Sequence, residues 1–230
     1  MKIKVCGMRE PDNIRAVTEL GIDMLGFIFY TKSPRYVRSI NTNAGTIPNM
    51  ADRRIMQSSK LNNRQPEKVG VFVDEMPQTV ITHAYNYKLD YIQLHGNETP
   101  VYIANLKSTI IPDILPNVKI IKALNIREAD DVKRWRQYDG IADMLLFDTK
   151  CANYGGSGEQ FDWDILEAYD GDIPFLLSGG IGPDDAQRVN DFHHPMCIGI
   201  DLNSRFETEP GIKDVEKLRV FISEINKDNR

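Results

Sequence analysis

Residues 143–163 read DMLLFDTKCANYGGSGEQFDW, and this stretch decides which fold the chain adopts. Met144 to Phe147 form a short apolar run, typical of a strand that is buried on both faces. Asp148 follows at the C-terminal edge of this run, and Gly155 to Gly158 form a loop whose N–H groups are open to an anion. Residues 161–163 are expected to begin a helix. One strand end thus offers a carboxyl group and a candidate phosphate site.

The same alternation of an apolar run and a helical segment recurs along the chain. Expected strands are Ile3–Cys6, Met24–Phe29, Val69–Val73, Tyr91–Leu94, Val118–Ala123, Met144–Phe147, Phe175–Leu177 and Cys197–Ile200. Expected helices are Pro11–Leu20, Pro77–Tyr87, Pro100–Lys107, Ala129–Tyr138, Pro183–Asn190 and Val215–Ile225. Such alternation implies parallel strands joined by right-handed crossovers. Eight units in 230 residues predict an α/β chain with a single domain over residues 1–230, a closed (β/α)8 TIM barrel rather than an open sheet.

Composition excludes several classes of protein. Apolar residues make up 41% and charged residues 27% of the chain, and no apolar run approaches the roughly 20 residues that span a bilayer. The N-terminus enters a strand directly without the apolar region of a secretory signal, which predicts a cytoplasmic protein. A net charge of -5 without a strong basic cluster argues against a nucleic-acid partner. The three widely separated cysteines predict neither a disulfide framework nor a zinc site, so the site should hold no metal.

In a barrel of this type the C-terminal strand ends and the loops after them share one face. The polar and glycine-rich candidates at this face are Cys6, Arg35, Gln93, His95, Asp148, Ser178, Gly179, Gly180, Asp201, Asn203 and Ser204. A thiolate at Cys6 and a carboxyl at Asp148 suit proton removal from carbon and protonation of oxygen. A thiol acts as such a base when its pKa is brought down toward neutrality by cations or helix N-termini.

Each of these residues also has a structural explanation. Cys6 could be a small buried residue, Asp148 could cap the following loop, and Arg35 could be a solvated surface residue. His95 could be a hydrogen-bonded structural histidine.

The glycine loops predict a phosphorylated small-molecule substrate. Three loops follow the last three strands, and they contain Gly156, Ser157 and Gly158, then Ser178, Gly179 and Gly180, then Asn203 and Ser204. Loops in these positions of a (β/α)8 barrel commonly bind phosphate through backbone N–H groups.

An ordered series of motifs carries a family resemblance. It runs KVCGMR (4–9), GFIF (26–29), SPRYV (33–37), GVFV (70–73), QLHG (93–96), FDT (147–149), GGSG (155–158), FDW (161–163), LSGGI (177–181) and GIDLNS (199–204). In these motifs the chain resembles phosphoribosylanthranilate isomerase of tryptophan biosynthesis.

The resemblance implies a cofactor-free Amadori rearrangement of N-(5-phosphoribosyl)anthranilate to 1-(2-carboxyphenylamino)-1-deoxyribulose 5-phosphate. It assigns ring-opening protonation to Asp148, removal of the C2 proton to Cys6, and the anthranilate carboxylate to Arg35. Gln93, His95 and Asp201 would contact the substrate, and the glycine loops would hold its phosphate. A monomer or weak homodimer is expected.

One position departs from the family pattern. Arg205 stands where the family often has Gly after the serine of the eighth-strand loop. If this position required a positive φ, Arg would cost on the order of 1 kcal/mol there.

Two other functions compete with the isomerase. Indole-3-glycerol-phosphate synthase would require a catalytic lysine among carboxylates, and neither Lys4 nor Lys122 is expected to have carboxylate neighbours. A catalytically silent barrel that only binds phosphorylated metabolites would not need both Cys6 and Asp148.

Overall fold

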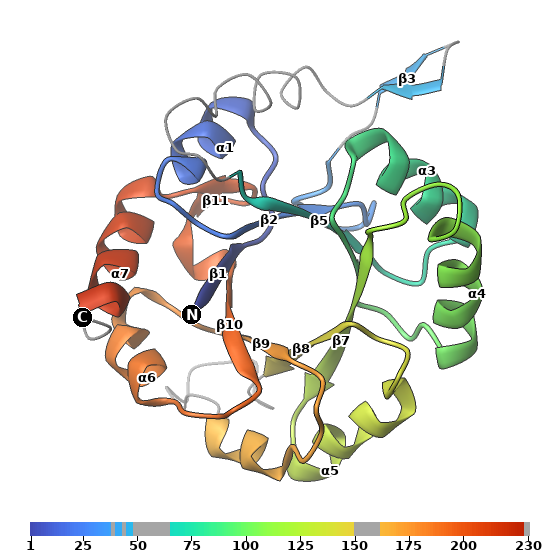
Figure 1. Ribbon diagram of the computed structural model, residues 1–230. Helices are drawn as coiled ribbons and strands as arrows, with labels where there is room; N and C mark the ends of the chain where they lie inside the picture. Colours follow the sequence, from blue (N-terminus) through green and yellow to red (C-terminus); the bar gives the residue numbers. More distant parts are fainter. Residues whose placement is uncertain (38–39, 43–44, 48–64, 150–161, 228–230) are drawn as a thin grey trace.

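The computed structural model describes residues 1–37, 40–42, 45–47, 65–149 and 162–227. Its principal sheet is a closed barrel of parallel strands (Figure 1). The barrel strands are β1 (Lys2–Val5), β2 (Met24–Ile28), β5 (Glu67–Phe72), β6 (Tyr91–Leu94), β7 (Lys119–Ile126), β8 (Met144–Thr149), β9 (Phe175–Ser178) and β10 (Cys197–Leu202). Around the barrel they follow the chain order, and β10 closes on β1. The predicted (β/α)8 architecture is confirmed.

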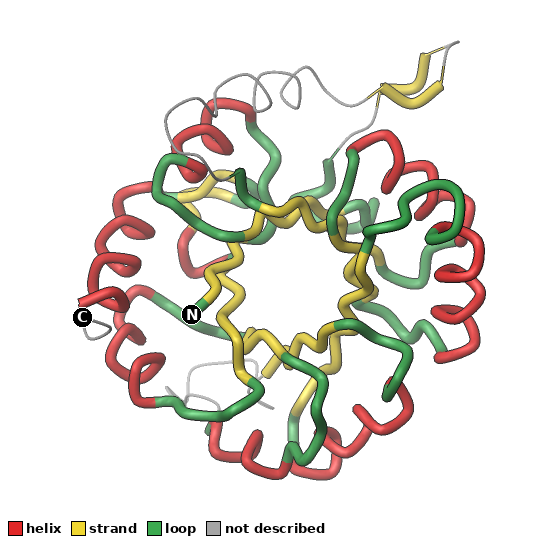
Figure 2. Tube along the Cα trace, in the orientation of Figure 1, coloured by secondary structure: helices red, strands yellow, loops and turns green. Residues whose placement is uncertain are grey.

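The helices form a ring outside the strands (Figure 2). They are α1 (Pro11–Thr18), α3 (Pro77–Tyr87), α4 (Pro100–Ile110), α5 (Ala129–Val132), η1 (Lys133–Tyr138), η2 (Trp163–Ala168), η3 (Pro183–Asp185), α6 (Ala186–Asp191) and α7 (Val215–Lys227). Pro occupies the first turn of α1, α3 and α4, where its missing N–H would have no intrahelical partner. Local sequence therefore fixes where these helices begin.

Several element boundaries differ from the sequence prediction. β8 and β10 extend further than their apolar runs, so Asp148 and Asp201 lie inside strands and not in the loops after them. The segment 129–138, expected as one helix, is a short α-helix followed by a 3-10 helix. The same holds, in reverse order, for η3 and α6. β8 and β10 are longer than predicted because the backbones of polar residues at their ends still pair with the neighbouring strand. An apolar pattern does not reveal this pairing.

Two small antiparallel hairpins were not predicted. β3 (Ile40–Thr42) pairs with β4 (Gly45–Ile47), and β11 (Glu207–Glu209) pairs with β12 (Ile212–Lys213) after the short helix η4 (Ser204–Phe206). The sequence also allows a helix over Ala51–Met56, and these residues lie outside the described part of the chain.

Buried apolar residues form two clusters on the two sides of the barrel wall. The smaller cluster fills the barrel interior and consists of Met24, Val69, Tyr91, Ile121, Ala123, Met144, Leu146 and Leu176. The larger one includes Leu145, Phe147, Phe175 and Leu177 and lies between strands and helices. Successive residues of β8 and β9 belong alternately to one cluster and the other, because neighbouring side chains of a strand point to opposite faces. Strand register therefore tells which other side chains face the interior.

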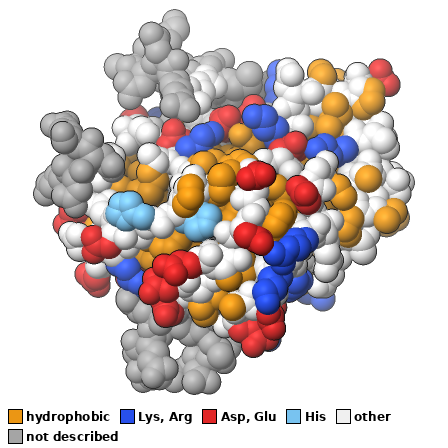
Figure 3. Space-filling view, turned by 60° about the horizontal axis from the view of Figure 1, so that its bottom comes forward, with side chains coloured by type: hydrophobic (Ala, Val, Ile, Leu, Met, Phe, Trp, Pro, Cys, Tyr) orange, Lys and Arg blue, Asp and Glu red, His pale blue; other side chains and the backbone are white. Residues whose placement is uncertain are grey.

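On the face shown in Figure 3, acidic and basic side chains are interspersed with apolar ones. None of the described helices is long and apolar enough to cross a bilayer.

Candidate active site

Strand register brings the predicted polar residues to the barrel interior. Asp148 is two residues beyond the inward Leu146, and Ser178 is its register partner on β9. Gln93 follows the inward Tyr91 in the same way on β6. Lys4 pairs in register with Met24 on one side and with Asp201 on the other, so these positions also point inward. The barrel mouth, meaning the C-terminal strand ends and the loops after them, is therefore lined with polar groups.

Cys6 is a buried thiol beside two lysines. A Cβ on Gly26 of the adjacent strand would come within 2.7 Å of its Sγ, so glycine at that position leaves room for the thiol. Burial raises the pKa of Cys6, while the charges of Lys4 and Lys213 act to lower it and that of Asp201 acts to raise it. The net direction in this structure is upward, opposite to the lowering expected of a thiol base.

Lys4 is fully buried and forms an ion pair inside the barrel. Its Nζ lies 2.8 Å from Asp201 Oδ1, and Ser178 Oγ donates to Asp201 Oδ2 over 3.3 Å. Burial disfavours the charge on Lys4, but Asp201 and Cys6 raise its pKa above the ordinary value, so the amine stays protonated. The expectation that Lys4 lacks carboxylate neighbours was wrong, because Asp201 is distant in sequence and adjacent only in the closed barrel.

Asp148 belongs to a chain of hydrogen bonds across the mouth. His95 Nε2 lies 3.2 Å from Asp148 Oδ2, and Gln93 Nε2 lies 3.0 Å from His95 Nδ1. With Gln93 donating to Nδ1, the proton of a neutral His95 sits on Nε2 and faces the carboxyl group. Asp148 is 8% exposed, which gives a substrate access to a group that is otherwise held by protein.

Lys122 also has a carboxylate partner, contrary to expectation, but it points away from the interior. It lies between the inward residues Ile121 and Ala123, so its side chain faces the helix layer. Its Nζ is 3.0 Å from Glu98 Oε2, and it donates to the carbonyl oxygens of Leu94 and Gly96. This buried pair holds the loop between β6 and α4, so Lys122 is not placed as a catalytic lysine.

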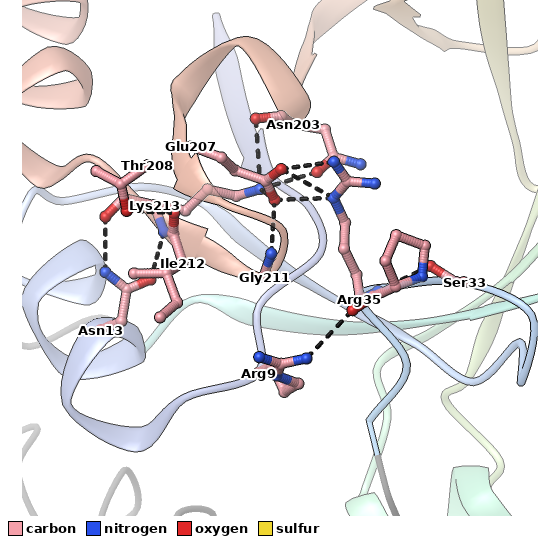
Figure 4. A network of polar contacts seen from close by, with 11 residues as sticks. Arg9, Asn13, Ser33, Arg35, Asn203, Glu207, Thr208, Gly211, Ile212 and Lys213 are labelled. Carbon is pink, nitrogen blue, oxygen red and sulfur yellow. Dashed lines mark hydrogen bonds and ion pairs between the residues drawn. The ribbon is translucent and has the colours of Figure 1, made fainter.

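Arg35 lies in a polar network that the sequence did not reveal (Figure 4). Its Nε and Nη2 contact the Glu207 carboxylate at 2.8 and 2.5 Å. Lys213 Nζ reaches the same carboxylate at 2.6 Å, and also contacts Asn203 Oδ1 at 2.8 Å. Glu207 and Lys213 come from the unpredicted hairpin, and their sequence neighbours give no periodic signal that would have identified them.

The glycine loop after β9 has a backbone that requires glycine. Gly179 and Gly180 have φ values of 99° and 70°, and a Cβ on Gly179 would lie 1.8 Å from the Thr149 carbonyl oxygen. Asn203 and Ser204 begin the turn of η4 after β10, beside this loop in the barrel order. The predicted phosphate residues Gly156, Ser157 and Gly158 lie outside the described residues.

Arg205 is not strained. It lies in η4, and the described non-glycine residues with positive φ are Asp74 and Lys88. The cost considered for this departure from the family pattern is therefore absent.

Comparison with known proteins identifies the family. A sequence model of N-(5'-phosphoribosyl)anthranilate (PRA) isomerases matches residues 3–224. An N-(5'-phosphoribosyl)anthranilate isomerase from Parabacteroides distasonis is 47% identical over 225 residues, covering 98% of this chain and 93% of the relative. The chain belongs to the phosphoribosylanthranilate isomerase family. Another relative with this name, from Phocaeicola vulgatus, is 40% identical over 98% of both chains.

Solved phosphoribosylanthranilate isomerases share the fold. The enzyme from Thermotoga maritima matches with a TM-score of 0.75 at 27% identity, over 99% of both chains. An isomerase in complex with reduced 1-(o-carboxyphenylamino)-1-deoxyribulose 5-phosphate matches with a TM-score of 0.73, also at 27% identity over 99% of both chains. The predicted family and its isomerase activity in tryptophan biosynthesis are thus confirmed.

Proposed function

We propose that Asp148 and Cys6 carry the two proton transfers by which this isomerase converts N-(5-phosphoribosyl)anthranilate to the aminoketose. The observation that carries the assignment is their position. Asp148 lies on β8 and Cys6 directly follows β1, both at inward positions of one mouth, and β9 and β10 separate their strands. A substrate spanning the mouth would meet an acid at one end and a base at the other.

Asp148 acts first, as the general acid. It gives a proton to the ribose ring oxygen, the bond between that oxygen and C1 breaks, and the electron pair on the anthranilate nitrogen forms the C=N bond of a protonated Schiff base. His95 Nε2, 3.2 Å away, orients the carboxyl group for this transfer. Gln93 in turn orients His95.

Cys6 then removes the proton from C2. The electrons of the C2–H bond form a C1=C2 double bond, and those of the C=N bond return to nitrogen, which gives an enolamine. This enolamine gains a proton at C1 and loses the proton of its C2 hydroxyl group, whose O–H electrons form the C=O bond of the ketone. In the structure, burial raises the pKa of Cys6. The cationic Schiff base lowers it when it forms beside the thiol, as Lys4 and Lys213 already do in part. The base is thus activated by the intermediate on which it acts.

Substrate binding divides between two ends of the mouth. Arg35 pairs with the anthranilate carboxylate. Asp201 contacts the substrate while it stays ion-paired with Lys4. The phosphate rests on the backbone N–H groups of the loops after β9 and β10, where Gly179 and Gly180 allow close approach. Among the described residues, no group of three or more His, Cys, Asp and Glu side chains could hold a metal ion.

Substitution of the two proposed catalytic residues tests this assignment. Asp148→Asn removes the acidic proton at constant size, so turnover should fall by about 100-fold to 10,000-fold while a reduced product analogue still binds. Cys6→Ser should lose at least roughly 100-fold by the same measure. Turnover is followed by loss of substrate fluorescence.

Cys197→Ser serves as the matched control, because Cys197 is a second cysteine that opens β10 at the opposite end of the barrel. Near-parental turnover in Cys6→Ser, or joint loss of ligand binding and thermal stability in Asp148→Asn, would remove that residue from the mechanism.

The oligomeric state and the cytoplasmic location stay predictions. The Thermotoga maritima isomerase is described as dimeric, and monomers were generated from it. Sedimentation at several protein concentrations would show whether this chain is a monomer or a weak homodimer.

A further inference from the structure

The network in Figure 4 contains a buried carboxylate that the proposed chemistry does not use. The Glu207 side chain is 5% exposed, although it comes from a short hairpin outside the barrel. Burial opposes its ionisation, but hydrogen bonds from Arg35 and Lys213 lower the pKa of Glu207 below its ordinary value. Glu207 is thus a carboxylate at neutral pH, and it is placed between two cations.

Glu207 constrains the orientation of the Arg35 guanidinium. Its Oε2 accepts from Nε at 3.0 Å and from Nη2 at 2.5 Å, and its Oε1 accepts from Nε at 2.8 Å. A planar guanidinium held through two nitrogens has one orientation. Within the described part of the chain, the hydrogen bonds of this guanidinium use Nε and Nη2, which leaves Nη1 for a ligand.

Glu207 is also held by groups of its own hairpin. Lys213 has a fully buried side chain whose Nζ contacts Glu207 Oε1 at 2.6 Å, and the Gly211 N–H donates to the same oxygen over 3.1 Å. Asn13 on α1 binds the backbone N–H and C=O of Lys213, each over 2.8 Å. The hairpin is therefore tied to the helix layer, and Glu207 has hydrogen-bond partners that hold it independently of Arg35.

The network also touches the reacting end of the site. A Cβ on Gly7, the residue after Cys6, would lie 2.7 Å from Arg35 Cδ and 3.4 Å from Lys213 Nζ. Exposure increases outward, with side-chain values of 0% for Lys213, 5% for Glu207 and 19% for Arg35. Two cations and one carboxylate leave one positive charge in excess, and Arg35 is its most accessible carrier.

We infer that Glu207, fixed by Lys213, is the positioning residue that aims Arg35 at the carboxylate of the substrate's aromatic ring, and so determines the preference for a 2-carboxyphenyl amine. This inference rests on the proposed role of Arg35. It does not depend on which residues transfer protons.

A comparison of two substrates tests it. The substrates are N-(5-phosphoribosyl)anthranilate and the corresponding aniline compound, which lacks the carboxylate, and the readout is the ratio of their kcat/KM values. Glu207→Gln should lower this ratio by between about tenfold and 100-fold, chiefly through KM, because Arg35 loses its fixed orientation. Any effect transmitted from Lys213 to Cys6 acts on both substrates and cancels in the ratio.

Three further variants make the test sharp. Glu209→Gln removes the same charge from an exposed position on β11 and should keep the parental ratio. Glu207→Asp keeps the charge but shortens the reach, and should give an intermediate ratio even if the Gln variant folds poorly. In a double variant with Arg35→Met, Glu207→Gln should cause no further loss of the ratio, because Glu207 acts through Arg35.

The outcomes distinguish failure of the Glu207 positioning role from failure of the proposed role of Arg35. Equal loss on both substrates in Glu207→Gln and in Glu207→Asp, with a parental preference for the carboxylate, would overturn the positioning role and leave the role of Arg35 intact. A parent enzyme that does not distinguish the two substrates would overturn both. Additive losses in the double variant would show that Glu207 acts independently of Arg35, and would also overturn the inference.

Discussion

At the scale of single residues, the reactivity of Cys6 is a balance between burial and charge. Burial and Asp201 favour the neutral thiol, whereas Lys4 and Lys213 favour the thiolate. Lys4 is itself kept protonated by Asp201, its partner at 2.8 Å. A neutral ion pair beside the thiol therefore supplies a cation without adding net charge to the barrel interior.

The pH dependence of turnover should reflect this balance. A base must be deprotonated, so kcat/KM should rise with pH as Cys6 ionises, and its raised pKa places this rise on the alkaline side of an ordinary cysteine. Lys4→Met removes a neighbouring cation that favours the thiolate and leaves the charge on Asp201, so the alkaline rise should move to higher pH. The double variant Lys4→Met/Asp201→Asn removes both charges, so the alkaline rise should move by less than in Lys4→Met. An unchanged profile in Lys4→Met would show that Lys4 does not influence the base.

At the scale of elements, the loop between β6 and α4 is built around a buried ion pair. Glu98 accepts hydrogen bonds from the N–H groups of Gly96 and Asp74 at 3.0 and 2.9 Å. Lys122, on the neighbouring strand β7, forms the ion pair with Glu98, and the side chains of both residues are 1% exposed. This loop follows directly from the strand that carries Gln93, so its stability supports the hydrogen-bond chain to Asp148.

Breaking this pair should reduce stability without a direct effect on chemistry. Lys122→Met leaves a buried carboxylate without its cation, which should lower the free energy of unfolding by about 3–5 kcal/mol. Lys133→Met removes a lysine from an ion pair whose side chains are 56% and 80% exposed, and should leave the free energy of unfolding almost unchanged. Denaturant unfolding measures both. Loss of turnover without any loss of stability in Lys122→Met would contradict an outward, structural role for this lysine.

At the scale of the whole molecule, phosphate binding should couple to global stability. A ligand that binds only the folded barrel stabilises it in proportion to the logarithm of its concentration, by about 2.7 kcal/mol at 100 times the Kd. Inorganic phosphate at millimolar concentration should therefore raise the Tm by several degrees and compete with the substrate.

A pair of glycine substitutions localises this effect. Gly179→Ala places a Cβ against the Thr149 carbonyl and should abolish most of the phosphate-induced rise in Tm. Gly140 also has a positive φ, 67°, but a Cβ there meets nothing within 4 Å, and it lies before β8 at the opposite end of the barrel. Gly140→Ala should lower the Tm slightly and keep the rise. Equal phosphate responses in the two variants would place the phosphate away from the β9 loop.

The sequence by itself determined the barrel and the face on which the candidate site residues lie. Apolar runs of four to six residues, prolines at helix starts and alternation of strand and helix are local signals, and each is read without knowledge of a partner. Position at a strand end was enough to place Cys6, Asp148 and Ser178 at the barrel mouth, because parallel strands bring their C-terminal ends together.

Only the tertiary structure decided which charges meet. Lys4 and Asp201 are 197 residues apart in sequence, and Arg35 and Glu207 are 172 apart, so neither pair leaves a local pattern. The facing of each side chain depends on strand register, and a shift of one residue would reverse it. Lys4 and Lys122 look alike in sequence as polar residues within apolar strands, yet one points into the barrel and the other into the helix layer. Closure of the barrel, which sets all registers at once, made that distinction.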